Sequence, residues 1–173
     1  MYEINSLDEN HEDFENYQLV EAESSLLFNG YLEFFERTLE TEKWTIVTFE
    51  MDNKIQISNP IRLKQNTKPS VWNDEVNINQ DIVGMPLFTW EDNAYGDNAI
   101  YFQVITSTNN DLLSGTYTYE NQFQYYNTNN VVLNITRETP PSLFSGSTYN
   151  FTLMDVSEDN WVNLVIQNQF QVQ

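Results

Sequence analysis

The stretch Val162-Asn-Leu-Val-Ile-Gln-Asn-Gln-Phe-Gln-Val172, close to the end of the chain, decides the fold class. Most of the even-numbered residues of this stretch are apolar: Val162, Leu164, Ile166, Phe170 and Val172. Most of the odd-numbered residues carry side-chain amides: Asn163, Gln167, Gln169 and Gln171. Side chains alternate across a strand, so the pattern predicts one long β-strand with one face in a core and one face in water.

Shorter runs of β-forming residues precede this strand and are separated by Asn, Asp and Gly. They cover 76–79, 85–90, 100–106, 116–119, 131–136 and 149–156. Seven short strands within one domain are typical of a β-sandwich. We therefore predict an all-β chain in which residues 69–173 form an antiparallel β-sandwich.

The segment Leu143-Phe-Ser-Gly-Ser-Thr-Tyr149-Asn-Phe-Thr-Leu153 resembles the E–F corner and F strand of fibronectin type III domains, which are immunoglobulin-like sandwiches. The resemblance implies that Tyr149 forms the tyrosine corner, in which a buried ring returns its hydroxyl to the upstream backbone. It also implies that Leu143 is a buried anchor and Gly146 a turn residue.

Two further segments are similar to the same family. Met85-Pro-Leu-Phe-Thr-Trp90 resembles its B strand, with Trp90 as the core tryptophan, and Ile100-Tyr-Phe-Gln-Val104 resembles its C strand. The resemblance implies a fold and not an activity, because such sandwiches serve adhesion, spacing and docking alike.

The charge of the chain excludes several partners. Among 173 residues, 26 acids face 7 bases, which gives a net charge of −19. Nucleic acids and anionic lipid surfaces are held mainly through Lys and Arg, so neither is expected as a partner. The chain has no cysteine, which excludes disulfides and thiolate chemistry, and no apolar run long enough to span a membrane.

Residues 1–16 contain six acids and no base, and this composition predicts a flexible acidic tail. Residues 17–68 are expected to form a small β-rich region with a hairpin near 44–58, in which 44–51 is one strand and Asp52-Asn53 the turn. Between 22 and 39 the apolar residues fit either strand alternation or a helical stripe. We favour strands, because Gly30 would weaken a helix.

The segment 154–163, continuing into 169–172, also resembles the ends of exported lipoproteins from Bacteroidota-type bacteria. That resemblance implies an acidic tether, residues 1–16, which joins a β domain to a lipid anchor on a cysteine absent from this sequence. It implies an extracytoplasmic location at the cell envelope.

The sequence contains few residues that could form a catalytic site together. His11 is the single histidine and falls in the expected tail, where we expect it to be exposed. The acid pairs Glu91-Asp92 and Glu158-Asp159 fall in expected turns, where solvated charge is the ordinary outcome. We therefore expect no enzyme activity and no obligatory cofactor.

Two groups of residues are candidates for binding. Asp92, Asn93 and Asp97 lie in one loop around Gly96 and offer the hard oxygens that Ca²⁺ prefers. An ordinary loop has the same composition. A tyrosine-rich group comprises Tyr117, Tyr119, Tyr125 and Tyr126. Exposed tyrosines stack on sugar rings or anchor protein interfaces, whereas buried ones would simply fill the sandwich.

These observations predict a non-enzymatic binding or scaffolding protein of a bacterial cell envelope, with a protein or a surface glycan as its partner. One alternative is a decoration or tail component of a virus particle. Another alternative is a carbohydrate-binding module of a glycan-use system.

Overall fold

The computed structural model describes residues 1–92, 94–127, 129–134 and 139–173. The described chain is all-β, apart from two short 3₁₀ helices, η1 (Phe14–Asn16) and η2 (Phe28–Gly30). It divides into two compact units. Unit 1 comprises Met1–Ser25, Glu33–Pro69 and Glu158–Trp161, and unit 2 comprises Leu26–Leu32, Ser70–Ser157 and Val162–Gln173.

Unit 1 contains a four-stranded antiparallel sheet with the strand order β2-β1-β5-β8. Its strands are β1 (Tyr2–Glu3), β2 (Gln18–Leu19), β5 (Lys43–Ile46) and β8 (Ile61–Leu63). A small core of Ile4, Tyr17 and Ile46, with Tyr2 and Trp44 packed against it, supports this sheet.

The prediction of a flexible tail over residues 1–16 is wrong. Tyr2 and Glu3 pair with β5, and the side chain of Ile4 is only 1% exposed. The hydroxyl of Tyr17 donates to the carbonyl of His11 over 3.0 Å, and burial raises the pKa of Tyr17 to about 12. A few apolar residues at the two ends of the acidic segment are therefore enough to fix it to the sheet.

Two further two-stranded sheets occur early in the chain. β3 (Glu23–Leu27) and β4 (Leu32–Glu36) form one of them, so the preference for strands over a helix in this region is confirmed. β6 (Thr48–Met51) and β7 (Lys54–Ile57) form the other around the expected turn. The expected single strand over 44–51 is interrupted, because the chain leaves β5 at Val47 and enters β6 as part of a different sheet.

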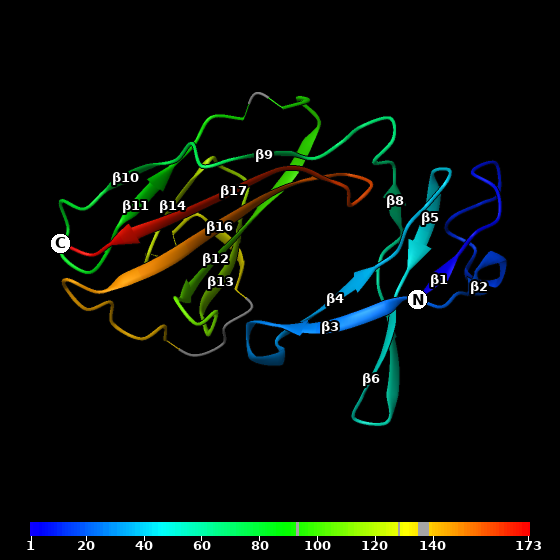
Figure 1. Cartoon of the computed structure of the whole chain (residues 1–173), viewed down its shortest axis with the longest axis horizontal. Coiled ribbons are helices and arrows are strands. Elements are labelled where there is room, and N and C mark those ends of the chain that lie inside the picture. Colours follow the sequence, from blue (N-terminus) through cyan, green and yellow to red (C-terminus); the bar gives the residue numbers. More distant parts are fainter. Residues whose placement is uncertain (93, 128, 135–138) are drawn as a thin grey trace. The chain divides into compact units, whose positions relative to one another are not determined.

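Unit 2 is a β-sandwich (Figure 1). One sheet has the order β10-β11-β14, formed by β10 (Asn77–Asn79), β11 (Leu87–Thr89) and β14 (Gln122–Gln124). The other has the order β15-β13-β12-β16-β17-β9. Its strands are β15 (Val131–Asn134), β13 (Leu112–Thr118), β12 (Asn98–Ser107), β16 (Thr148–Ser157), β17 (Val162–Gln171) and β9 (Val71–Asn73).

Aromatic side chains from both sheets meet in the core of unit 2. Phe88 of β11 stacks on Phe151 of β16 with ring centroids 4.2 Å apart, and Phe170 of β17 meets Phe88 edge-on at 5.2 Å. Such pairs add to the stabilisation that burial of the rings already supplies. The two sheets are therefore held face to face by one aromatic core.

The strand arrangement of unit 2 is the one that the fibronectin type III resemblance implies. The strand matched to B, β11, lies in one sheet, while the strands matched to C and F, β12 and β16, are neighbours in the other. Tyr149 is 8% exposed, and its hydroxyl accepts a hydrogen bond from the backbone amide of Phe144 over 3.1 Å. Trp90 and Leu143 are buried, and Gly146 has a φ of +79°, a conformation that favours glycine.

The alternation predicted for the last strand fails near its start, where Val165 and Asn163 are both buried. Asn163 was expected on the wet face but is 0% exposed. The pairing of β16 with β17 shifts register between Asp155 and Val156, and this irregularity places Asn163 outside the regular alternation.

Candidate functional site

The β6–β7 hairpin is the most exposed apolar feature of unit 1. Asp52 and Asn53, with φ of 53° and 58°, connect the paired residues Met51 and Lys54. Two residues with positive φ match the right-handed twist of a hairpin, and Asp and Asn adopt that conformation more readily than most residues. At the base of the hairpin, the amide of Ser58 donates to the carbonyl of Val47 over 2.9 Å.

Four large apolar side chains of this hairpin face water, and we call them the hairpin patch. The exposed fractions are 53% for Phe49, 55% for Met51, 73% for Ile55 and 49% for Ile57. The register places Phe49 and Met51 on one face and Ile55 and Ile57 on the other. Both faces of the ribbon therefore offer apolar surface.

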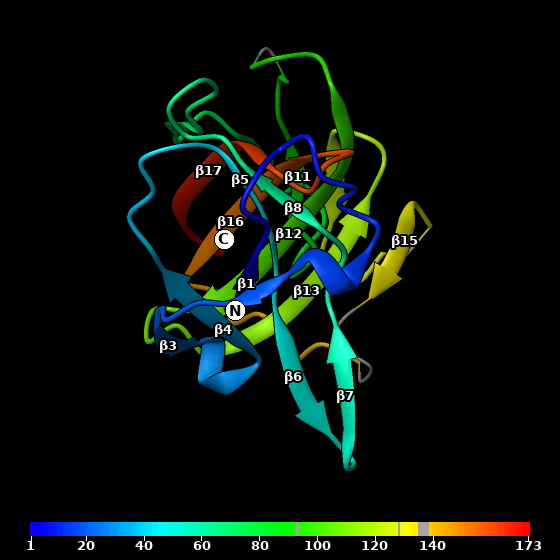
Figure 2. The ribbon, with the colours of Figure 1, turned by 90° about the vertical axis from the view of Figure 1, so that its right-hand side faces the viewer.

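The edges of the hairpin are also open. Figure 2 shows β6 and β7 as a two-stranded ribbon, and in the described part of the chain neither strand pairs with a third. An edge strand presents unpaired N–H and C=O groups to which another strand can add. The hairpin thus combines apolar side chains with available backbone groups.

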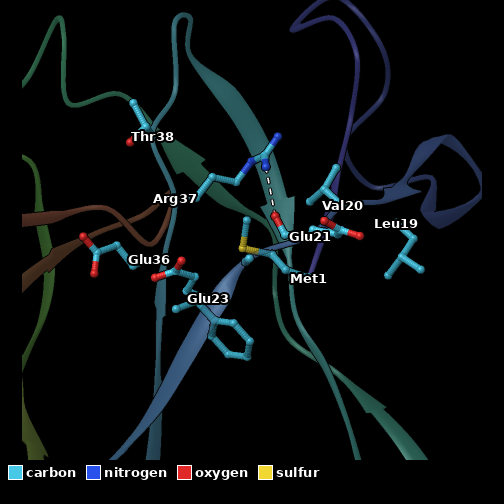
Figure 3. Close-up of a pocket in the computed structure, with 10 residues that line it drawn as sticks. Met1, Leu19, Val20, Glu21, Glu23, Glu36, Arg37 and Thr38 are labelled. Atoms are coloured by element: carbon cyan, nitrogen blue, oxygen red, sulfur yellow. Dashed lines mark hydrogen bonds between the residues drawn. The ribbon is translucent and has the colours of Figure 1, made fainter.

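A hollow in unit 1, drawn in Figure 3, is lined by Arg37, whose charged side chain already has partners within the chain. The guanidinium of Arg37 donates to both carboxylate oxygens of Glu3, at 2.6 and 3.3 Å, and to the carbonyl of Glu21 at 3.0 Å. Glu23 and Glu36 also line the hollow. Because Arg37 holds the chain together in this way, we do not assign it a ligand.

The structure does not display the tyrosine-rich group as a surface. Tyr125 is 0% exposed, its hydroxyl donates to the carbonyl of Pro141 over 2.7 Å, and burial raises its pKa. Tyr126 packs partly buried against the same core and donates to the carbonyl of Pro140. The interpretation of Tyr125 as an exposed contact is wrong, because β14 brings it into the sandwich.

The other two tyrosines differ from each other. Tyr117 is half-buried on β13 and stacks on Phe102 at 4.6 Å, and burial raises its pKa. Tyr119 is 65% exposed. Of the four tyrosines, only Tyr119 presents most of its surface to water.

The expected calcium loop forms hydrogen bonds within unit 2. Asp92 accepts from the hydroxyl of Tyr101 at 2.8 Å, and Asp97 accepts from the side-chain amide of Asn163 at 2.8 Å. Asn93 lies outside the described residues. Across the ranges that the structure describes, no three His, Cys, Asp or Glu side chains are grouped so that they could hold a metal ion by themselves.

Sequence reasoning missed two polar residues beside this loop, Asp155 and Asn163, which are both 0% exposed. Burial raises the pKa of Asp155, while hydrogen bonding by the side-chain amides of Asn98 and Asn163 opposes that shift. A signal was present for Asp155, since it continues the inward-facing row of Tyr149, Phe151 and Leu153 on β16.

His11 is not the isolated exposed residue that was expected. Its ring stacks on Trp44 with centroids 4.0 Å apart and planes 9° apart. Its Nε2 lies 3.3 Å from a carboxylate oxygen of Glu12. This stacking gives His11 a role in packing the start of the chain onto β5.

Comparisons with known proteins add little. No protein-family model matches the sequence, and no curated protein matches it. Among solved structures, the extracellular region of rat CD45, domains d3-d4, matches with a TM-score of 0.43 and 12% identity over 97% of this chain and 85% of that chain. Because that score is too low to establish a common fold, the sandwich is assigned from its own strand order and core. No helix in the described residues has the length and apolarity needed to cross a bilayer.

Proposed function

We propose that this chain is a non-enzymatic binding protein that holds a protein partner through the β6–β7 hairpin. The observation that carries the proposal is the hairpin patch, Phe49, Met51, Ile55 and Ile57. These side chains are exposed on a ribbon that joins no larger sheet within the described residues. An isolated two-stranded hairpin is only marginally stable in water, so contact with a partner would stabilise it.

The chemistry of the patch supports a protein partner over a sugar. Its side chains are aliphatic or thioether except for Phe49, whereas sugar sites rely on aromatic stacking and amide hydrogen bonds. The flexible thioether side chain of Met51 adapts to apolar protein surfaces. The open strand edges could also accept a strand of the partner.

The charge of the chain supports a different protein over a second copy. Two copies would each bring −19, and this repulsion opposes self-association. A partner with a basic region beside an apolar groove would be attracted by the charge and would bury the patch. We therefore expect a complex with a different protein, whose affinity falls as the salt concentration rises.

The test compares two exposed apolar sites. The variant Phe49→Ser/Ile55→Ser is expected to lose a partner that the native chain recovers from envelope extracts, because it removes apolar surface from both faces of the hairpin. The control Phe144→Ser changes a side chain that is 69% exposed in unit 2 and should retain the partner. Equal recovery by all three proteins would count against the hairpin as the contact site.

The proposal includes an extracytoplasmic location at a bacterial cell envelope, where a strong net charge keeps a displayed protein soluble. Fractionation of the source cells should recover the protein with the envelope. Recovery in purified virus particles would contradict this location. The hairpin variants would still test the contact site in that case.

A further inference from the structure

The inward-facing row of β16 includes a carboxylate. Tyr149, Phe151, Leu153 and Asp155 alternate along this strand, and Asp155 is as fully buried as the apolar residues before it. One oxygen of Asp155, Oδ1, accepts from the side-chain amide of Asn98. The other oxygen, Oδ2, is buried and has no hydrogen-bond partner.

A second unpartnered oxygen lies on the neighbouring strand. Asn163 of β17 is 0% exposed, and its Nδ2 donates to Oδ1 of Asp97 over 2.8 Å. Its Oδ1 is buried without a partner. Asp155 pairs with Leu164, so Asn163 is next to it along β17. The other polar atom of each side chain is bonded to one of two consecutive residues, Asn98 for Asp155 and Asp97 for Asn163.

The surroundings of these two oxygens are negative. The charges of Asp92 and Asp97 both act on Asp155 and raise its pKa, after the larger effect of burial. Apart from Arg137, which lies outside the described residues, unit 2 contains no Lys or Arg. Buried oxygens of this kind are costly unless a hydrogen-bond donor or a cation satisfies them.

We propose that Asp155 and Asn163 bind a divalent cation of the Ca²⁺ type beside Asp97 and Asn98, with Asp92 and Asp97 supplying further negative charge. Ca²⁺ accepts carboxylate, side-chain amide, backbone and water oxygens in irregular geometry, whereas Mg²⁺ demands a strict octahedron. A site that depends on a neutral amide oxygen does not require three grouped acids. With so few charged ligands, its dissociation constant is expected to be about 10⁻⁴–10⁻³ M.

The experiment titrates CaCl₂ into the full chain and follows thermal unfolding and the heat of binding. The native protein should show saturable binding and a higher unfolding temperature in Ca²⁺ than in chelator, and MgCl₂ at equal ionic strength should give less than half of the shift. Asp155→Asn and Asp97→Asn should each weaken Ca²⁺ binding at least tenfold. Asp111→Asn is the matched control in unit 2, since Asp111 accepts from Ser107 elsewhere, and it should bind as the native chain does.

Two results would overturn the proposal. One is the absence of saturable Ca²⁺ binding to the native protein, which does not depend on any variant folding. The other is an Asp155→Asn protein that is more stable than the native chain by the same amount with Ca²⁺ and with chelator. That result would mean that a proton, and not a cation, occupies the unpartnered carboxylate oxygen.

Discussion

The hydroxyl of Tyr149 joins the start of β16 to the segment before it, because it accepts a hydrogen bond from the amide of Phe144. Tyr149→Phe keeps the ring in the core and removes this acceptor, so we expect the free energy of unfolding to fall by about 1 kcal/mol. Urea unfolding measures the loss. The control Tyr119→Phe removes a hydroxyl from a residue that is 65% exposed and should change nothing measurable, so equal losses would refute the role of the corner.

Glu42 supplies stability that depends on pH. The hydroxyl of Thr67 and the guanidinium of Arg62, which donates to Glu42 over 2.8 Å, hold the pKa of Glu42 below its ordinary value of 4.5. A carboxylate with a lowered folded pKa stabilises the fold above its ordinary value, and the effect is lost as pH falls through the folded pKa.

Glu42→Gln is therefore expected to lower the free energy of unfolding at pH 7 by about 1 kcal/mol. The difference from the native chain should shrink as the pH falls below the ordinary pKa of 4.5. Denaturant unfolding at a series of pH values measures this, and a difference that does not change with pH would contradict the assignment.

The burial of a residue could not be predicted from sequence alone where it depends on contacts between distant segments. The identity of Tyr149 as a corner residue follows from a local pattern, Leu, a glycine turn and Tyr. Tyr125 has no such pattern, and its burial depends on β14 pairing with β11, a contact between distant segments. The burial of Asp155 and Asn163 depends in the same way on contacts with distant residues, Asn98 and Asp97 respectively.

At the scale of elements, the strands of regular alternation were predictable, and some of the three-residue strands were not. β16 and β17 lie close to their expected limits, because ten residues of alternation leave little ambiguity. β9 and β14 were missed, since their three residues show no clear alternation and their pairing with β17 and β11 joins distant segments. The hairpin patch was not predictable either, because apolar residues of both parities usually indicate burial on both faces.

The turn of the β6–β7 hairpin provides a test at the same scale. Asn53 has a φ of 58°, so Asn53→Ala should strain the turn and destabilise the hairpin by about 1 kcal/mol, whereas Asn53→Gly should be tolerated. Hydrogen exchange of the β6 and β7 amides should accelerate in the alanine variant and remain near the native rate in the glycine variant. Equal acceleration in both variants would contradict a turn governed by positive φ.

At the scale of the whole molecule, the two units have separate cores of very different size. The core of unit 1 contains Ile4, Tyr17 and Ile46, whereas that of unit 2 is built from many aromatic and aliphatic side chains. Stability rises with the apolar surface that a unit buries, so the native chain should unfold in two steps, unit 1 first. Ile46→Ala should lower only the first calorimetric transition, and Phe151→Ala, which costs about 3–5 kcal/mol, only the second. A single transition that both variants shift equally would mean that the chain unfolds as one cooperative body despite its two cores.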